Sequence, residues 1–222
     1  VGLLHALYAL KGQMVTKYQL ASTAAEIEIN KLGRTIGKQD HFAAAYGNLN
    51  TISFYADEKV VVEPVFYRPE TVTELEKNMI MFYTKLKRDA SEVLKEQKKE
   101  AINKKAILRK MKELVPELRE TLSSGVDLNR VGEILHNGWI LKRSLTKNIS
   151  NGVIDSYYEK ARSAGALGGK LLGAGGGGFL LLYVEKQNTE RVIKSLKELY
   201  SMPVGIHAGG SRITYYDQTM VK

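Results

Sequence analysis

Two segments of this sequence bring together residue types that can do chemistry. In the first, Lys38, Gln39, Asp40 and His41 follow directly after a glycine, and Glu28 lies twelve residues before Asp40. In the second, glycines dominate the six residues just before the uncharged run 179–184: Gly173, Ala174, Gly175, Gly176, Gly177 and Gly178. Carboxylates accept protons and bind Mg²⁺, and bare backbone N–H groups form nests for anions such as phosphate. These residue types predict chemistry on a ligand that carries phosphate.

The glycine segment is not one of the two best-known phosphate loops. Residues 173–178 match G-x-G-x-x-G literally, but that dinucleotide fingerprint must open a helix, and a β-type run follows here. Gly169-Lys170 resembles the end of a Walker A loop, yet Leu171 stands where Ser or Thr would bind magnesium. We interpret the segment as a phosphate loop of another kind. The alternative is a turn whose backbone packs tightly on a neighbouring element.

Glu28 lies within a predicted helix that runs from about Thr16 to Leu32. On a wheel of 100° per residue, Glu28 falls in the middle of the apolar side, whereas Glu26 points away. An acid in that position is costly unless it is paired or bound to a metal ion. Lys31 borders the same side and could be its partner; we favour a carboxylate that faces a metal.

Asp40 and the pair Lys142-Arg143 each have an ordinary explanation beside a functional one. An aspartate in the first turn of a helix is stabilised by the helix dipole, which alone would explain Asp40. Its neighbour Lys38 and the upstream Glu28 make a functional cluster the better interpretation. Lys142-Arg143 could hold a substrate phosphate by charge-assisted hydrogen bonds, although such a pair on a basic protein is more often an exposed surface feature.

The remaining pattern predicts the elements that position these residues. Val1–Leu10 is apolar almost all round and indicates a buried helix, and two β-type runs at 51–55 and 60–67 indicate a hairpin. Helical spacing continues from Leu75 to Leu94, and further helices are expected at 104–122, 127–145, 153–163 and 189–200. A strand is expected at 179–184, and a hairpin around Gly209-Gly210. The layout predicts an α+β sandwich.

Composition restricts the class of protein and its compartment. The chain has 222 residues, 44% of them apolar and 26% charged, which is typical of a globular protein. Cysteine is absent, which excludes disulfides and favours the cytoplasm. No apolar run approaches the length of a membrane span. The net charge of +9 comes from basic residues mixed with acids, so we expect anionic small ligands and no nucleic acid or membrane as partners.

Two of these segments together resemble the GHMP superfamily of small-molecule kinases. They are Gly37-Lys38-Gln39-Asp40 with the following Ala-Ala-Ala-Tyr46-Gly47, and Lys170-Leu-Leu-Gly173 through Phe179. Within the superfamily the sequence resembles the sugar-phosphate kinases that make D-glycero-D-manno-heptose 1,7-bisphosphate from the 7-phosphate. L-fucokinase-like enzymes share a similar Gly-Lys-Gln-Asp and remain an alternative, as does a non-catalytic basic module that binds anions or RNA.

The resemblance implies a role for each candidate residue. ATP would donate its γ-phosphate to a sugar hydroxyl whose proton Asp40 accepts, and Glu28 would bind Mg²⁺. The resemblance places residues 173–178 near the nucleotide phosphates. Contacts to the sugar phosphate are then expected from the following residues: Lys38, Gln39, His41, Lys142 and Arg143.

The resemblance also implies a two-domain organisation. Residues 1–69 would be the remainder of an N-terminal catalytic domain of the ribosomal S5 domain 2-like type. Residues 70–222 would form a C-terminal domain with a ferredoxin-like α/β sandwich and extra helices. The Gly- and Ser-rich loop that holds ATP phosphates in this family is expected before Val1, so we expect this piece alone to have little activity. A homodimer is left open.

Overall fold

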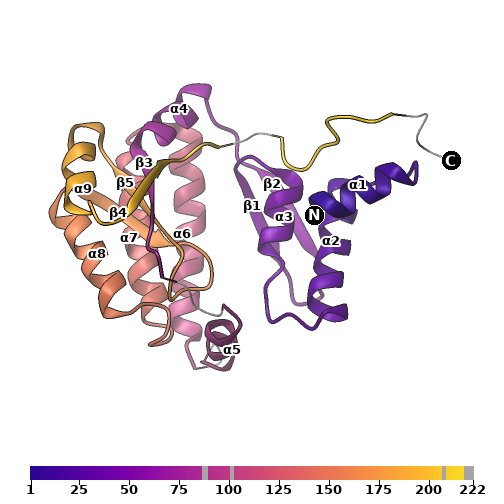
Figure 1. Cartoon of the computed structure of the whole chain (residues 1–222), viewed down its shortest axis with the longest axis horizontal. Helices are drawn as coiled ribbons and strands as arrows, with labels where there is room; N and C mark the ends of the chain where they lie inside the picture. The colour runs from indigo at the N-terminus through magenta and orange to yellow at the C-terminus, as the bar shows by residue number, and fades with distance from the viewer. Residues whose placement is uncertain (87–89, 101–102, 207–208, 218–222) are drawn as a thin grey trace. The chain divides into compact units, whose positions relative to one another are not determined.

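The computed structural model describes residues 1–222 except 87–89, 101–102, 207–208 and 218–222. The chain divides into two compact units, Val1–Val65 with Ile206–Lys222 and Phe66–Gly205 (Figure 1). The sequence pattern places the boundary a few residues later and keeps the C-terminal segment with the second unit. The assignment of the two parts to a catalytic and a C-terminal kinase domain stays a prediction.

The first unit consists of helices and one antiparallel hairpin. Its elements are α1 (Gly2–Leu10), α2 (Lys17–Glu26), the π-helix η1 (Ile27–Lys31), α3 (Gln39–Tyr46), β1 (Asn50–Phe54) and β2 (Val60–Pro64). Thr16 begins α2 through a capping box with Gln19, in which each residue's side chain bonds the other's backbone. Leu20, Phe42 and Val60 belong to its core. The hairpin is confirmed, with Ile52 opposite Val62. The prediction that the first helix is buried is wrong, because no residue of α1 is buried.

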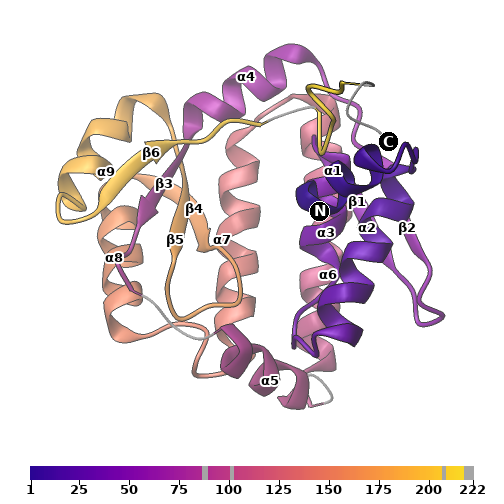
Figure 2. The same cartoon turned by 45° about the vertical axis from the view of Figure 1, so that its right-hand side comes forward.

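The second unit is an α/β sandwich around a four-stranded antiparallel sheet. Its elements are α4 (Pro69–Asn78), β3 (Met79–Tyr83), α5 (Ala90–Glu100), α6 (Lys105–Ser124), α7 (Asn129–Arg143), α8 (Gly152–Ser163), β4 (Ala166–Leu171), β5 (Phe179–Val184), η2 (Lys186–Asn188), α9 (Thr189–Ser195) and β6 (Tyr200–Pro203). The strand order β4-β5-β3-β6 is that of a ferredoxin-like split βαβ fold, so the α+β class is confirmed. Figure 2 shows the β4–β5 loop beside one end of α7 and close to α5.

The predicted helical segment from Leu75 to Leu94 contains a central strand instead. β3 pairs with β5 and with β6, and Phe82 is fully buried in the sheet. The residues 79–83 are all apolar or aromatic, and such a short run satisfies helical spacing and strand packing equally well. Pairing with two distant strands therefore decides the structure, and neither pairing can be seen in a local pattern.

Gly168 lies inside β4, and the reason is close packing. A Cβ atom on Gly168 would lie 1.8 Å from the carbonyl oxygen of Gly132 in α7, so only glycine allows the helix and strand to approach this closely. At this glycine the alternative that the sequence left open, tight packing on a neighbouring element, is the correct one. The same alternative applies to two glycines of the loop 173–178, because a Cβ on Gly175 would lie 2.8 Å from the Ile149 carbonyl oxygen and one on Gly177 would lie 2.4 Å from that of Leu86.

The predicted C-terminal hairpin does not form. β6 ends at Pro203, and residues 212–216 are not a strand, while 207–208 lie outside the described residues. Gly210 packs instead on the end of α3, where a Cβ on Gly47 would lie 2.1 Å from the Gly210 nitrogen. The two glycines thus permit a contact between backbones rather than a tight turn. Among the described residues, no helix is both long and apolar enough to cross a membrane.

Candidate functional site

The first group of predicted residues gathers at the start of α3. Lys38 is the N-cap residue, and Asp40 lies in the first turn, where the helix dipole favours an acid. Gln39 and Asp40 are exposed, whereas His41 is buried. Within the described part of the chain, the Asp40 carboxylate makes no hydrogen bond or ion pair. It is therefore available to a ligand.

Glu28 contacts the residue that follows Asp40. Its Oε2 atom lies 3.0 Å from Nε2 of His41, and 51% of the Glu28 side chain is exposed. The other ring nitrogen of His41, Nδ1, is buried and has no partner among the described residues. The contact joins η1 to the start of α3, and it uses only one of the two carboxylate oxygens of Glu28.

The prediction that Glu28 lies in the middle of an apolar helix face is wrong, because the helix changes type beside it. From Ile27 the hydrogen bonding is i→i+5, with the Leu32 N–H donating to the Ile27 carbonyl at 2.9 Å. A wider turn shifts the phase of a 100° wheel, so Glu28 becomes exposed and the partner of its carboxylate is His41 rather than Lys31. Single π-turns within helices often occur at functional sites. The metal-binding role of Glu28 stays a prediction.

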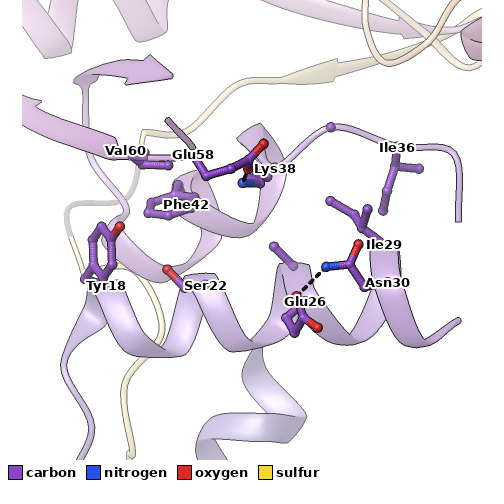
Figure 3. Close-up of a pocket in the computed structure, with 12 residues that line it drawn as sticks. Tyr18, Ser22, Glu26, Ile29, Asn30, Ile36, Lys38, Phe42, Glu58 and Val60 are labelled. Atoms are coloured by element: carbon purple, nitrogen blue, oxygen red, sulfur yellow. Dashed lines mark hydrogen bonds and ion pairs between the residues drawn. The ribbon is translucent and has the colours of Figure 1, made fainter. Parts of the chain in front are cut away.

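A cavity of about 690 Å³ lies in the first unit beside these residues (Figure 3). Lys38 lines it and forms an ion pair with Glu58 of the β1–β2 turn, while Glu26 accepts a hydrogen bond from Asn30. Glu28 and Asp40 are not among its lining residues. Glu26 is exposed, as expected for a residue that points away from the apolar side of the helix.

In the second unit, hydrogen bonds hold the carbonyl groups of the glycine loop in place. Three carbonyl oxygens each accept a bond from a different segment: that of Gly173 from Lys142 Nζ (2.7 Å), that of Ala174 from Gln97 Nε2 (2.9 Å) and that of Gly178 from the Thr84 hydroxyl (2.8 Å). Carbonyl oxygens repel anions. A loop that engages these groups elsewhere is suited to present its N–H groups to a negative charge.

The N–H groups of the same loop are only partly used. Gly176 donates to the carbonyl of Ile149 at 2.9 Å and Gly178 donates to a neighbouring segment, but those of Gly173, Ala174 and Gly177 bond no acceptor in the described structure. The φ angle is positive at Gly173, Gly175, Gly176 and Gly178, at 77°, 116°, 78° and 99°. Side chains rarely tolerate such angles. These angles explain why glycines occupy the loop, and its role in phosphate binding stays a prediction.

Lys142 and Arg143 do not act as a pair. Arg143 forms an ion pair with Asp155 at 3.1 Å, and Lys142 bonds the glycine loop. Neighbouring residues on a helix point in different directions, so this separation follows from α7 itself. Lys142 is joined instead by Lys170 of β4, which the sequence analysis did not select. Burial and, secondly, the charge of Lys170 lower the pKa of Lys142 to about 8, and burial lowers the pKa of Lys170.

A magnesium ion would find a limited set of protein ligands here. The described residues contain no group of three or more His, Cys, Asp or Glu side chains placed to hold a metal. Glu28, however, has a carboxylate that is half exposed and only partly engaged. Mg²⁺ usually takes one or two carboxylates together with water and substrate phosphates. A single carboxylate such as that of Glu28 would fit an ion that arrives with a nucleotide.

Part of the second unit matches a known protein family. Residues 114–201 match the family described as GHMP kinases C terminal, a segment that extends from α6 to β6 and includes the glycine loop. This segment is similar to the C-terminal domain of GHMP kinases, and the resemblance recognised from the sequence is confirmed.

Two relatives each match about four fifths of this chain. The D-glycero-alpha-D-manno-heptose 7-phosphate kinase of Campylobacter jejuni is 29% identical over 184 residues, which cover 82% of this chain and 54% of that protein. A bifunctional fucokinase/GDP-fucose pyrophosphorylase of Arabidopsis thaliana is 26% identical over 183 residues, 79% of this chain and 17% of its own length.

A solved relative has a similar structure over almost the entire chain. The crystal structure of a D-glycero-D-manno-heptose 1-phosphate kinase from Bacteroides thetaiotaomicron superposes with a TM-score of 0.66 at 28% identity, covering 97% of this chain and 61% of that one. The chain is homologous to sugar kinases of the GHMP family, and it spans about half to three fifths of the length of the two heptose phosphate kinases.

Proposed function

We propose that this chain is part of an ATP-dependent kinase that transfers the γ-phosphate to a hydroxyl of a sugar phosphate. The most specific form of the proposal is transfer to the anomeric hydroxyl of D-glycero-D-manno-heptose 7-phosphate. Homology to heptose phosphate kinases supports the sugar class. The product would carry phosphate at both ends.

The observation that carries the proposal is the state of the glycine loop. Its carbonyl groups at Gly173, Ala174 and Gly178 are engaged by other segments, and several of its N–H groups remain without acceptors among the described residues. A nest of this kind is an arrangement for phosphate. Phosphoryl transfer depends mainly on positioning and on stabilising charge, both of which such a loop supplies.

The remaining residues take the roles that their surroundings favour. Asp40 hydrogen-bonds the attacking hydroxyl and accepts its proton, which its exposed and unpaired carboxylate permits. Glu28 binds Mg²⁺, whose charge lowers the electrostatic cost of phosphoryl transfer. His41 holds Glu28 in position. Lys38 and Gln39 contact the sugar, and Lys142 and Arg143 contact its phosphate.

Residues 173–178 would bind the nucleotide phosphates. We further propose that the protein acts in the cytoplasm, where ATP is available.

An L-fucokinase-like activity is the second candidate, favoured by the similarity to the Arabidopsis protein. It would differ in accepting a sugar that carries no phosphate.

The test is a substrate screen with the intact protein, because this chain spans only part of its relatives. ADP release with Mg·ATP is measured on D-glycero-D-manno-heptose 7-phosphate, the 1-phosphate, L-fucose, galactose and unphosphorylated heptose. We expect the highest kcat/KM on the 7-phosphate and a much lower value on the unphosphorylated heptose. Preference for L-fucose would support the second candidate instead, and turnover of none of these sugars would refute a sugar kinase.

A further inference from the structure

A second cavity, of about 160 Å³, lies inside the second unit. It is bounded by α6, α7 and β4, and most of the side chains around it are apolar. Its two charged lining residues are both cations, Lys142 from α7 and Lys170 from β4. Because no carboxylate is among the lining residues, the two ammonium groups have no counter-ion there. Trp139 also lines the cavity.

This arrangement is unfavourable for the empty protein. Burial removes hydration from both ammonium groups and lowers the pKa of each, and the charge of Lys170 lowers the pKa of Lys142 further. The indole N–H of Trp139 is buried and has no acceptor among the described residues, at 1% exposure of that residue. Buried donors without acceptors cost free energy as well. An anion in the cavity would offset the repulsion and the lost hydration of the two ammonium groups.

We propose that the cavity between α6, α7 and β4 binds the phosphate group that the sugar substrate already carries, with Lys142 and Lys170 as its two cationic contacts. The inference rests on the proposed function, and it deepens that function by adding Lys170 to the specificity residues. The ion pair of Arg143 with Asp155 makes Arg143 the weaker contact of the predicted pair.

The size of the cavity decides which group it accepts. Pockets for complete small ligands measure roughly 300–1,000 Å³, and a single water occupies about 30 Å³. A volume of about 160 Å³ therefore suits one phosphate-sized substituent and is too small to enclose a nucleotide or a whole sugar. Lys142 also donates to the carbonyl of Gly173, so the same side chain joins this cavity to the glycine loop.

Trp139 makes the proposal directly testable, because it is the only tryptophan of the 222-residue chain. Its fluorescence is followed while the chain is titrated with inorganic phosphate, D-glycero-D-manno-heptose 7-phosphate or unphosphorylated heptose. We expect a saturable change with both phosphate-bearing ligands, tighter for the sugar phosphate, and none with the unphosphorylated sugar at equal concentrations. Equal responses to the two sugars would overturn the proposal, as would a response to inorganic phosphate alone.

Variants distinguish a built site from general attraction to a basic protein. Lys170→Gln should weaken binding of the sugar phosphate by about tenfold or more, the value of a charge-assisted hydrogen bond. Lys112→Gln is the matched control, since Lys112 is exposed on α6 and is not a lining residue of the cavity. It should change the affinity less than twofold. Equal losses in both variants would contradict the assignment.

A stability measurement distinguishes loss of binding from loss of the fold. Lys170→Met removes a poorly hydrated charge, so its melting temperature should equal or exceed that of the wild type, although binding is lost. A clear loss of stability would mean that Lys170 has a structural role.

The inference and the proposed function can fail separately. Sugar-phosphate turnover with an unchanged KM in intact Lys170→Gln would refute only the inference, whereas binding in the cavity without phosphotransfer would refute only the kinase.

Discussion

At the scale of single residues, the charges without a partner are more informative than the paired ones. Lys38 and Arg143 are each paired with a carboxylate. The Asp40 carboxylate has no partner in the described structure, and no carboxylate lines the cavity that Lys142 and Lys170 share. Ionisable groups that lack a partner of opposite charge in the empty protein often occur at sites where a ligand binds. The sequence pointed to Asp40 and Lys142 through their neighbours in the chain, but it could not show that Lys170 lies beside Lys142.

The lowered pKa of Lys142 predicts how stability depends on pH. In the folded chain the pKa is about 8, against an ordinary value of 10.5. Between these values the unfolded chain holds a proton that the folded chain has released, so the free energy of unfolding rises with pH across this window. Below about pH 8 the full penalty of the charge is present. Lys142→Met should therefore gain more in melting temperature over wild type at pH 7 than at pH 10.

Melting temperatures of both proteins from pH 7 to pH 10 provide the check. A difference that stays constant across this range would contradict the lowered pKa. Lys147→Met is a suitable control because Lys147 is exposed and follows the end of α7. Its effect should not depend on pH over the same interval.

At the scale of elements, local patterns predicted most helices, the hairpin β1–β2 and the strand β5. They failed where contacts with segments distant in the sequence determine the local structure. The run 79–83 becomes β3 because β5 and β6 pair with it. Gly168 lies in a strand because β4 pairs with β5, and the lack of a side chain there lets α7 approach. The π-turn at Ile27–Lys31 is a further limit, since a wheel assumes one fixed period. The sequence predicted correctly that the glycines 173–178 precede a strand, and their role in phosphate binding stays a prediction.

Packing between α7 and β4 predicts a large effect of one methyl group. Gly168→Ala would place a Cβ 1.8 Å from the Gly132 carbonyl oxygen, so the helix must move away from the sheet. We expect a loss of about 1–3 kcal/mol in the free energy of unfolding, as for overpacked cores. Gly152→Ala is the control, because a Cβ there meets nothing within 4 Å at the start of α8. It should be neutral or stabilising. Urea unfolding measures both, and equal midpoints for the two variants would contradict the close approach.

At the scale of the whole molecule, the net charge of +9 suits anionic substrates. The charge is spread along the chain among acids and is not concentrated with aromatic residues, which favours a general field over a nucleic-acid surface. The candidate residues are distributed over both compact units. The first carries Glu28 and Asp40, and the second carries the glycine loop with Lys142 and Lys170.

This field predicts a dependence on salt. Screening shortens the range of charge interactions to about 10 Å at 0.1 M ionic strength and about 3 Å at 1 M. The affinity of the intact protein for ATP should therefore fall as KCl is raised, whereas its affinity for uncharged adenosine should change little. Calorimetric titrations at several salt concentrations measure both. Equal salt dependence of the two ligands would argue against an electrostatic contribution.

The most direct test of the central proposal is turnover by the intact protein after Asp40→Asn, a change that keeps the shape of the side chain and removes its basicity. With D-glycero-D-manno-heptose 7-phosphate and Mg·ATP, we expect kcat to fall by about 10²- to 10⁴-fold, the usual contribution of a general base. The Kd for ATP should remain that of the wild type, which shows that the fold and the glycine loop are intact. Turnover of the variant at the wild-type rate would contradict the assigned role of Asp40 and, with it, this account of the site.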